Sequence, residues 1–301
     1  MTGPAPASLP PGALRALARR HGITPKKSLG QHFLVEPALA RRIAELAGIG
    51  PRDRVLEVGA GLGSLTVVLA ATGATVVAVE IDPRLIPALK EVTTGLPRVR
   101  VVRADAMRVS WRSVLEGRPW ILVANLPYNV AVPVVLRALE EEPRIRRMLV
   151  MVQREVGERL AARPGDEQFG AVSLRVAYRA EASVVRRVRP TVFWPVPGVE
   201  SVLVRLERRD APPVDTDEAT LFHVVNEAFG QRRKTMRNAL VRLGVAAEGA
   251  AAILERCGVD PRSRPEELSL ESFARVADAV GPLGPARSRL PGRRRGAKGE
   301  T

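Results

Sequence analysis

The chain has few of the features that mark secreted or membrane proteins. Cys257 is the single cysteine among 301 residues, which excludes an internal disulfide and indicates a reducing compartment. No stretch approaches the roughly 18 consecutive apolar residues of a membrane helix, and the first twenty residues lack the apolar core of a signal peptide. With three histidines, none near a cysteine, a metal site is not expected. We therefore expect a cytoplasmic protein without a membrane segment.

Acidic residues are absent from the start of the chain, because none precedes Glu36. Residues 1–25 are therefore expected to form a basic N-terminal arm, and the Gly- and Arg-rich residues 282–301 a disordered basic tail. Lys and Arg exceed Asp and Glu by 47 − 32 = 15, which favours a polyanionic partner such as a nucleic acid. The alternative is that abundant arginine reflects the codon bias of a GC-rich genome.

Val- and Ile-rich runs alternate with helix-like stretches, a pattern typical of a parallel sheet covered by helices. Five successive runs are predicted as strands, and two later ones, 183–188 and 201–206, as an antiparallel pair closing one edge of the sheet. The stretches 65–71, 83–92, 130–141 and 155–162 have the apolar spacing of helices. The five strands are Arg54 to Gly59, Thr75 to Glu80, Val99 to Asp105, Trp120 to Asn125 and Met148 to Gln153.

Beyond residue 208 the sequence changes character. A Pro- and Asp-rich connector leads to stretches that are all helix-like, at 218–229, 232–243, 248–257 and 270–280. We therefore predict an α/β domain over residues 26–208 and a smaller, all-helical C-terminal domain over residues 216–281.

A glycine turn follows the first predicted strand, in VLEVGAGLGSLT. Gly59 and Gly61 are predicted to let a nucleoside-bearing ligand approach the backbone at the carboxyl edge of the sheet. Ser64 stands where the dinucleotide motif G-x-G-x-x-G has its last glycine, which disfavours pyrophosphate. Glu80 ends the second strand, suited to accept hydrogen bonds from ribose hydroxyls, and Asp105 ends the third, suited to bind an adenine amino group. Either acid alone also fits a turn or a helix cap.

The tetrapeptide Asn125, Leu126, Pro127 and Tyr128 follows the fourth strand at the same edge. An exocyclic adenine amine is a poor nucleophile, because its lone pair is delocalised into the ring. If the Asn125 oxygen and a neighbouring backbone carbonyl accept its two N–H bonds, the nitrogen is held pyramidal and aimed at an electrophile. Tyr128 offers a face for an extruded base. The structural alternative is an ordinary Asn-Pro turn with a core tyrosine.

Two further segments fit this cleft. Phe193, in FWPVP, is predicted to close the other face of the base; the alternative is a hydrophobic plug beneath a proline turn. The segment KKSLGQHFL places Lys26 and Lys27 ahead of His32 and Leu34, where it is predicted to cover the cofactor. Lys26 and Lys27 are also predicted to contact RNA.

These motifs, in this order and spacing from Lys26 to Val280, resemble the KsgA family of ribosomal RNA adenine dimethyltransferases. The resemblance implies a Rossmann-like class I fold that binds S-adenosyl-L-methionine, and two methyl groups added at N6 of each of two adjacent adenines in the 3′-terminal hairpin loop of small-subunit (16S) rRNA. His32 stands where the family more often has Asn, and Ala60 where Pro is usual. The cofactor contacts implied are His32, Leu34, Gly59, Glu80, Asp105 and Asn125.

The segment QRRKTMRNAL, read as the opening of a helix, is similar to the second-domain signature of the small-subunit enzymes. It implies RNA contacts by Arg232, Arg233, Lys234 and Arg237; a solvated basic helix face is the alternative. Such phosphate contacts fix position and carry little sequence information. The expected partner is rRNA in a small-subunit precursor particle, bound by a monomer.

Three alternatives stay open on the sequence. The antibiotic-resistance methyltransferases of 23S rRNA share every catalytic motif named above. A non-catalytic small-subunit assembly factor would use the fold only as a scaffold, against which the intact Glu80, Asp105 and NLPY set argues. DNA adenine and protein glutamine methyltransferases use the same Asn-x-Pro-Tyr chemistry, but their function does not require a second basic domain.

Overall fold

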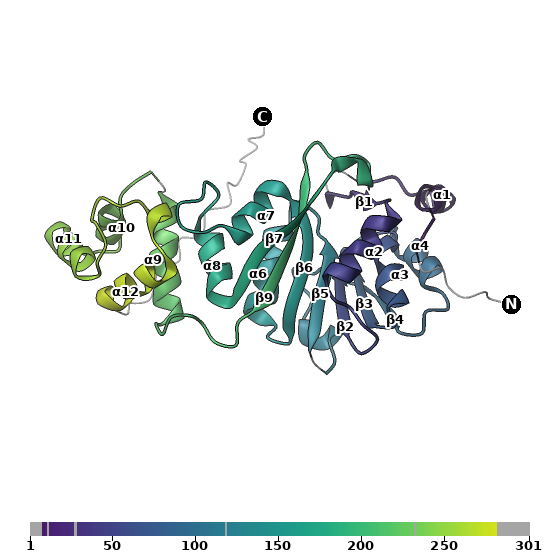
Figure 1. Cartoon of the computed structure of the whole chain (residues 1–301), viewed down its shortest axis with the longest axis horizontal. Coiled ribbons are helices and arrows are strands. Elements are labelled where there is room, and N and C mark those ends of the chain that lie inside the picture. Colours follow the sequence, from purple (N-terminus) through teal and green to yellow (C-terminus); the bar gives the residue numbers. More distant parts are fainter. Residues whose placement is uncertain (1–7, 11, 27–28, 118, 232, 282–301) are drawn as a thin grey trace, which may run out of the picture. The chain divides into compact units, whose positions relative to one another are not determined.

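The computed structural model describes residues 8–10, 12–26, 29–117, 119–231 and 233–281. The chain separates into two compact units, residues 1–213 and 214–301, drawn from purple to yellow in Figure 1. The predicted basic tail, residues 282–301, lies outside the described residues. None of the described helices is long and apolar enough to cross a membrane.

The first unit is built on a seven-stranded sheet with the strand order β4-β3-β2-β5-β6-β9-β7 (Figure 1). The first five of these strands are parallel, and β9 runs antiparallel to both of its neighbours. The predicted sheet, with its antiparallel pair at one edge, is therefore confirmed. Its strands are β2 (Arg54–Val58), β3 (Thr75–Glu80), β4 (Val99–Arg103), β5 (Trp120–Asn125), β6 (Ile145–Gln153), β7 (Ala180–Val188) and β9 (Ser201–Arg208).

Two strands end earlier than predicted. β2 ends at Val58 because Gly59 adopts a positive φ of 74°, which is outside the extended region. β4 ends at Arg103, and Asp105 lies in the following turn, where its Oδ1 accepts a hydrogen bond from the backbone N of Met107 at 2.8 Å.

Helices cover both faces of the sheet (Figure 1). The predicted helix at residues 83–92 begins only at Ile86, because the backbone N of Leu85 bonds to the Asp82 carbonyl in a tight turn. The sequence patterns did not predict α1, α5 or α8. The described helices of this unit are α1 (Ala13–Arg20), α2 (Pro37–Leu46), α3 (Ser64–Ala71), α4 (Ile86–Thr93), α5 (Trp111–Val114), α6 (Ala131–Glu141), α7 (Arg154–Ala161) and α8 (Ala171–Arg179).

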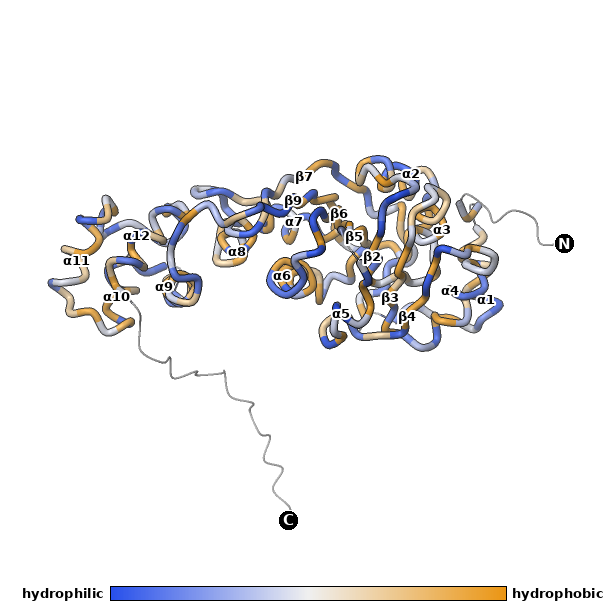
Figure 2. The backbone as a smooth tube through the Cα atoms, turned by 90° about the horizontal axis from the view of Figure 1, so that it is seen from below, coloured by the Kyte–Doolittle hydropathy of each residue, from blue (hydrophilic) through white to orange (hydrophobic). Residues whose placement is uncertain are grey.

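The core lies on both sides of the sheet because successive residues of each central strand point to opposite faces. Leu56 and Leu122 belong to the cluster that includes residues of α5, α6 and α7. Val55 and Val123 belong to the cluster that includes residues of α2 and α3. Orange stretches in Figure 2 mark these hydrophobic strands.

The segment predicted as a basic arm contains a helix packed on this unit. Leu14 and Leu17 of α1 are buried in one cluster with Phe33 and Leu85, while Arg15 and Arg19 are exposed. Two short strands, β1 (Phe33–Leu34) and β8 (Phe193–Trp194), pair antiparallel beside the main sheet. They join the N-terminal segment to the loop before β9, with the short helix η2 (Pro190–Val192) leading into β8.

The second unit is helical, with α9 (Glu218–Gly230), α10 (Met236–Arg242), α11 (Ala247–Arg256), the short η3 (Pro265–Glu267) and α12 (Leu270–Val280). The prediction that a helix begins at Arg232 is wrong. Helix α10 begins at Met236, after the backbone N of Lys234 has bonded to the Gln231 carbonyl in a turn. Arg233 and Lys234 therefore lie on a loop.

Candidate active site

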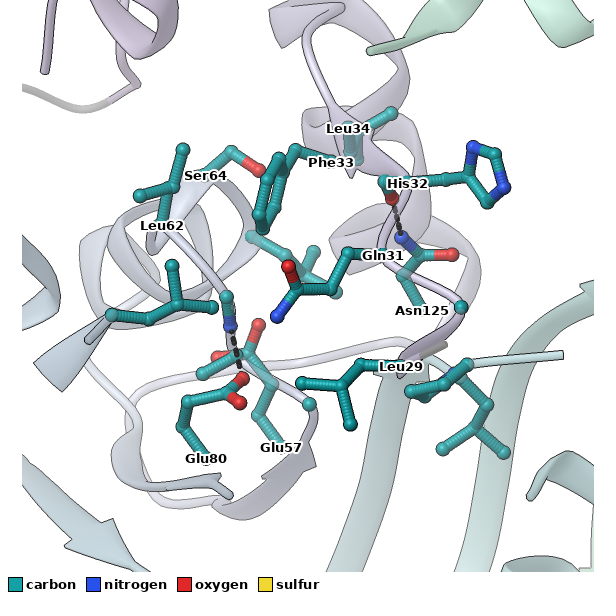
Figure 3. A pocket seen from close by; sticks show the side chains of 18 of the residues that line it. Leu29, Gln31, His32, Phe33, Leu34, Glu57, Leu62, Ser64, Glu80 and Asn125 are labelled. Carbon is teal, nitrogen blue, oxygen red and sulfur yellow. Dashed lines mark hydrogen bonds between the residues drawn. The ribbon is translucent and has the colours of Figure 1, made fainter. Parts of the chain in front are cut away.

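A cavity opens at the carboxyl edge of the parallel strands. Counting its open mouth, it holds about 690 Å³. Its lining comes from the ends of β2, β3 and β5 and from residues 29–34 (Figure 3). The structure therefore brings together the glycine turn, Glu80 and the tetrapeptide, which the sequence placed at the carboxyl ends of strands, and the N-terminal segment.

The glycine turn lies close to the tetrapeptide. A Cβ atom on Gly59 would lie 3.3 Å from Cδ of Pro127, and one on Gly61 would lie 3.1 Å from the Phe33 ring. Both glycines also have positive φ angles, 74° and 59°, which other residues rarely adopt. Glycine is thus favoured here by its backbone conformation, and the space for a Cβ atom is tight.

Glu80 is buried at the end of β3, with 5% of its surface exposed. Its Oε2 accepts a hydrogen bond from the backbone N of Gly61, and its Oε1 accepts one from that of Asp82, each at 2.8 Å. Burial raises the pKa of Glu80, although these backbone bonds oppose the shift. A carboxylate has about four acceptor positions, and backbone N–H groups of Gly61, Ile81 and Asp82 interact with Glu80, so the side chain can still accept a hydrogen bond from a ligand hydroxyl.

Glu57 is a cavity residue that the sequence patterns did not place in the site. It is 2% exposed, and its Oε2 accepts a hydrogen bond from the Thr66 hydroxyl at 2.6 Å. Burial raises its pKa to about 8. An acid within the apolar run VLEVG was the available signal, since buried charges are costly unless they are paired.

Asp105 does not line the cavity in this structure. It lies beyond the end of β4, beside β3, where the backbone N of Ala104 bonds to the Glu80 carbonyl at 3.0 Å. Its carboxylate caps the turn at Met107 and lies 3.7 Å from Arg108 Nε. The turn role is therefore observed, and the interaction with an adenine amino group stays a prediction.

The Asn125 amide is held in one orientation at the cavity wall. Its Nδ2 donates a hydrogen bond to the His32 carbonyl at 2.9 Å (Figure 3). Oδ1 is then the acceptor left over for a ligand, because within the described part of the chain it has no hydrogen-bond donor. Leu126 is buried, and its backbone N bonds to the Met151 carbonyl. The tetrapeptide is thus anchored to β6 while Asn125 faces the cavity.

Tyr128 lies at the mouth of the same cavity. Its hydroxyl is 2.9 Å from Ser201 Oγ, and its ring stacks on the His32 ring with centroids 5.3 Å apart and planes inclined by 27°. Burial raises the pKa of Tyr128, so the phenol is neutral at physiological pH.

Phe193 does not reach the cavity. It is 1% exposed and belongs to the core cluster that includes Leu34, its partner in the β1–β8 pair. The expectation that it closes one face of a bound base is therefore wrong for this arrangement, because its ring offers no free surface. The alternative of a hydrophobic plug beneath the proline turn describes its position.

The N-terminal segment is fastened over the cavity by polar contacts. Gln31 accepts a hydrogen bond from the backbone N of Lys26 at 2.8 Å and donates one to Asp82 Oδ2 at 2.9 Å. Hydrogen bonds from Arg84 and Gln31 lower the pKa of Asp82 to about 2, against its partial burial. Leu34 is buried and lines the cavity. Lys27 lies outside the described residues.

The RNA contacts predicted in QRRKTMRNAL belong to the second unit, whereas Lys26 and Lys27 belong to the first. Arg233, Lys234 and Arg237 are exposed, and Arg237 Nε also donates to the Ala247 carbonyl at 3.2 Å. Arg232 lies outside the described residues.

The charge of the cavity selects among ligands. Its lining includes the carboxyl groups of Glu57 and Glu80, and among the described lining residues no lysine or arginine is present. Because its pKa is about 8, Glu57 is mainly neutral at pH 7. The described lining therefore offers a phosphate no basic partner, and Glu80 is left as the carboxyl that can face a cation.

Comparisons with known proteins agree with this geometry. Residues 22–280 match the model of a family described as ribosomal RNA adenine dimethylase. A protein of Thermobifida fusca named ribosomal RNA small subunit methyltransferase A is 50% identical over 275 residues, covering 90% of this chain and 95% of the relative. A protein of the same name from Pelotomaculum thermopropionicum is 44% identical over 282 residues, covering 89% and 96%.

Two solved structures are also similar. A dimethyladenosine transferase from Plasmodium falciparum shares the fold with a TM-score of 0.71 at 24% identity, covering 81% of this chain and 96% of that one. The 23S rRNA methyltransferase ErmE has a TM-score of 0.65 at 28% identity, covering 82% and 99%. These matches confirm the predicted fold class, a Rossmann-like methyltransferase sheet followed by a smaller helical domain.

Proposed function

This chain belongs to the ribosomal RNA adenine dimethylase family, and from that premise we propose that it dimethylates two adjacent adenines at N6 in the 3′-terminal hairpin loop of small-subunit rRNA. The observation that carries the proposal is the oriented Asn125 amide, whose acceptor oxygen remains available beside an acidic cavity. The small-subunit target is favoured by the names of the relatives that are 44% and 50% identical.

S-adenosyl-L-methionine is the methyl donor, and the residues of the cavity fit it. It supplies an electrophilic methyl group on a positively charged sulfonium. Glu80 suits the ribose hydroxyls through its free lone pairs. Gly59 and Gly61 leave the backbone open where a Cβ atom would lie tightly against Pro127 or Phe33. The carboxyl group of Glu80 matches a cation, and we assign Asp105, Leu34 and the backbone of His32 as further contacts.

The protein's part in the chemistry is to orient a weak nucleophile. Asn125 Oδ1 accepts one N–H of the adenine amine and a backbone carbonyl of the tetrapeptide accepts the other, so the nitrogen lone pair points out of the ring plane. Pro127 stiffens the turn, and Tyr128 stacks on the base, an interaction worth about 1–3 kcal/mol. No strong base is needed, because the amine becomes acidic once it is methylated and its proton passes to solvent.

The RNA partner is proposed to be a small-subunit precursor particle in the cytoplasm, bound by a monomer. Lys26, Lys27, Arg232, Arg233, Lys234 and Arg237 are proposed to hold its phosphates, which positions the hairpin loop without reading its sequence. RNA shape then contributes much of the selectivity.

A second candidate is methylation of 23S rRNA, which the likeness to ErmE favours. The two are separated by methyl transfer from labelled S-adenosyl-L-methionine to unmethylated small-subunit particles and, in parallel, to naked large-subunit RNA, with nucleoside analysis of the product. We expect dimethyladenosine in small-subunit RNA alone. Label confined to large-subunit RNA would instead assign a resistance-type activity, and tight particle binding without transfer would assign an assembly factor.

A further inference from the structure

One face of the Tyr128 ring is already covered by another side chain. The His32 imidazole lies on it, with ring centroids 5.3 Å apart and planes inclined by 27°. An inserted base needs about 7 Å between the two flanking rings, two van der Waals separations of about 3.5 Å each. No base fits between Tyr128 and His32 as they stand.

The His32 ring is also fixed by a hydrogen bond. Its Nδ1 lies 2.7 Å from the Pro195 carbonyl oxygen, and because a carbonyl only accepts, Nδ1 carries the proton. Pro195 follows β8 in the loop that leads to β9. The ring thus connects the N-terminal segment, the tetrapeptide and this loop.

The backbone of His32 has a separate task. Its carbonyl oxygen accepts the hydrogen bond from Asn125 Nδ2 at 2.9 Å (Figure 3). Any residue at position 32 retains this carbonyl, so the orientation of Asn125 does not depend on the imidazole. In Figure 3 the ring points away from Asn125 and from the labelled cavity residues. The effects of the ring and of the backbone can therefore be separated by substitution.

We propose that the His32 ring is a positioning residue that occupies the base-stacking face of Tyr128 until RNA arrives, and that the target adenine must displace it to stack there. The inference rests on the proposed function, because it concerns the base that this site would methylate. Displacement separates the His32 ring from Tyr128 and breaks the hydrogen bond between His32 Nδ1 and the Pro195 carbonyl oxygen. A base that only stacks on Tyr128 gains about as much stacking energy as the displaced His32 ring loses. Further interactions, such as hydrogen bonds to Asn125, are therefore needed to hold the base. The His32 ring thereby disfavours binding of bases that cannot make these further interactions.

Two substitutions test the competition in opposite directions. His32→Ala removes the competing ring, so kcat/KM for unmethylated RNA is expected to rise by roughly two- to tenfold, the range of one aromatic pair. His32→Phe keeps a ring that can stack on Tyr128, so its kcat/KM is expected to stay at or below that of the wild type. If the ring merely supported the site, both substitutions would lower kcat/KM.

Controls separate this inference from the function on which it rests. His223→Ala, which changes a partly buried histidine of α9, is expected to leave kcat/KM unchanged. The affinity for S-adenosyl-L-methionine and the unfolding midpoint of each variant show whether the cofactor site and the fold persist. A wild-type enzyme that methylates adenine, combined with an Ala variant at or below its kcat/KM, overturns the inference alone. A wild type that methylates no rRNA adenine overturns the proposed function.

Discussion

At the scale of single residues, the site depends on polar side chains that are held by hydrogen bonds to the protein and still have a free acceptor position for a ligand. Both oxygens of Glu80 accept hydrogen bonds from backbone N–H groups, and the Asn125 amide donates to His32 while its oxygen has no donor among the described residues. Such groups need no reorganisation when a ligand binds, because their orientation is already fixed. The chemistry of the cavity is therefore one of preformed acceptors.

Replacing Asn125 tests this directly. Asn125→Ala removes the acceptor oxygen, and we expect methyl transfer to fall by about 10²- to 10³-fold, the range for loss of one preorganised hydrogen-bonding group. RNA binding should persist, because the proposed phosphate-binding residues lie elsewhere. Transfer rates and RNA affinity would be measured side by side. Asn129→Ala, a neighbouring exposed residue that does not line the cavity, serves as the control; equal losses in both variants would contradict the assignment.

Glu57 should make the stability of the protein depend on pH. Burial raises its pKa from 4.5 to about 8 in the fold, so the folded state binds this proton more tightly than the unfolded chain does. The resulting stability is fully present below about pH 4.5 and is lost as the pH rises through about 8.

We therefore expect Glu57→Gln to gain free energy of unfolding relative to the wild type as the pH rises from about 5 to 9. The gain should be on the order of a few kcal/mol, at about 1.4 kcal/mol per pKa unit. Urea unfolding of the cofactor-free proteins across this range provides the measurement. Parallel curves for the two proteins would mean that Glu57 does not titrate as its burial indicates.

At the scale of elements, the sheet domain depends on close approach of helix to strand. A Cβ atom on Gly157 of α7 would lie 2.2 Å from Cγ2 of Val202 and 2.9 Å from Cγ2 of Val204. Both valines lie on β9, the antiparallel strand whose insertion beside β6 completes the sheet. Helix α7 can pack so closely only because residue 157 has no side chain.

Gly157→Ala should accordingly destabilise the fold. Overpacking of a core typically costs about 1–3 kcal/mol, which exceeds the gain in helix propensity of about 1 kcal/mol. Gly249→Ala is the matched control, since a Cβ on that helical glycine of α11 would meet only Val245, at 3.7 Å. Thermal unfolding should show a lower midpoint for the first variant and an unchanged or higher one for the second.

At the scale of the whole molecule, two compact units divide the work that we propose. The first contains the acidic cavity, which suits a cationic cofactor, and the second presents Arg233 and Lys234 on an exposed loop before α10. An excess of 15 positive charges over the chain favours a polyanion overall. The cavity residues and the Arg233–Lys234 loop that we assign to cofactor and RNA thus lie in different units of the same chain.

Substituting this loop should weaken RNA binding without changing cofactor affinity. We expect the double variant Arg233→Ala, Lys234→Ala to lower particle affinity and to reduce the slope of log K against log salt by about 0.7–0.9 for each phosphate that the variant no longer neutralises. Titrations at several salt concentrations measure both quantities. The pair Arg256→Ala, Arg262→Ala removes the same charge from other positions of this unit; an equal change of slope there would show a general charge effect instead.

The sequence by itself determined the succession of strands along the chain, the glycine turn, and the gathering of Glu80 and Asn125 at one edge. These depend on local pattern and on the rule that parallel strands end at a common edge. Only the tertiary structure decided which side chains face the cavity. Phe193 is buried through the pairing of β1 with β8, and Glu57 is enclosed by the packing of α3. The His32 ring stacks on Tyr128 although the two residues are far apart in the chain. The reason is physical, because burial and contact arise from segments far apart in the chain, and no local pattern records them.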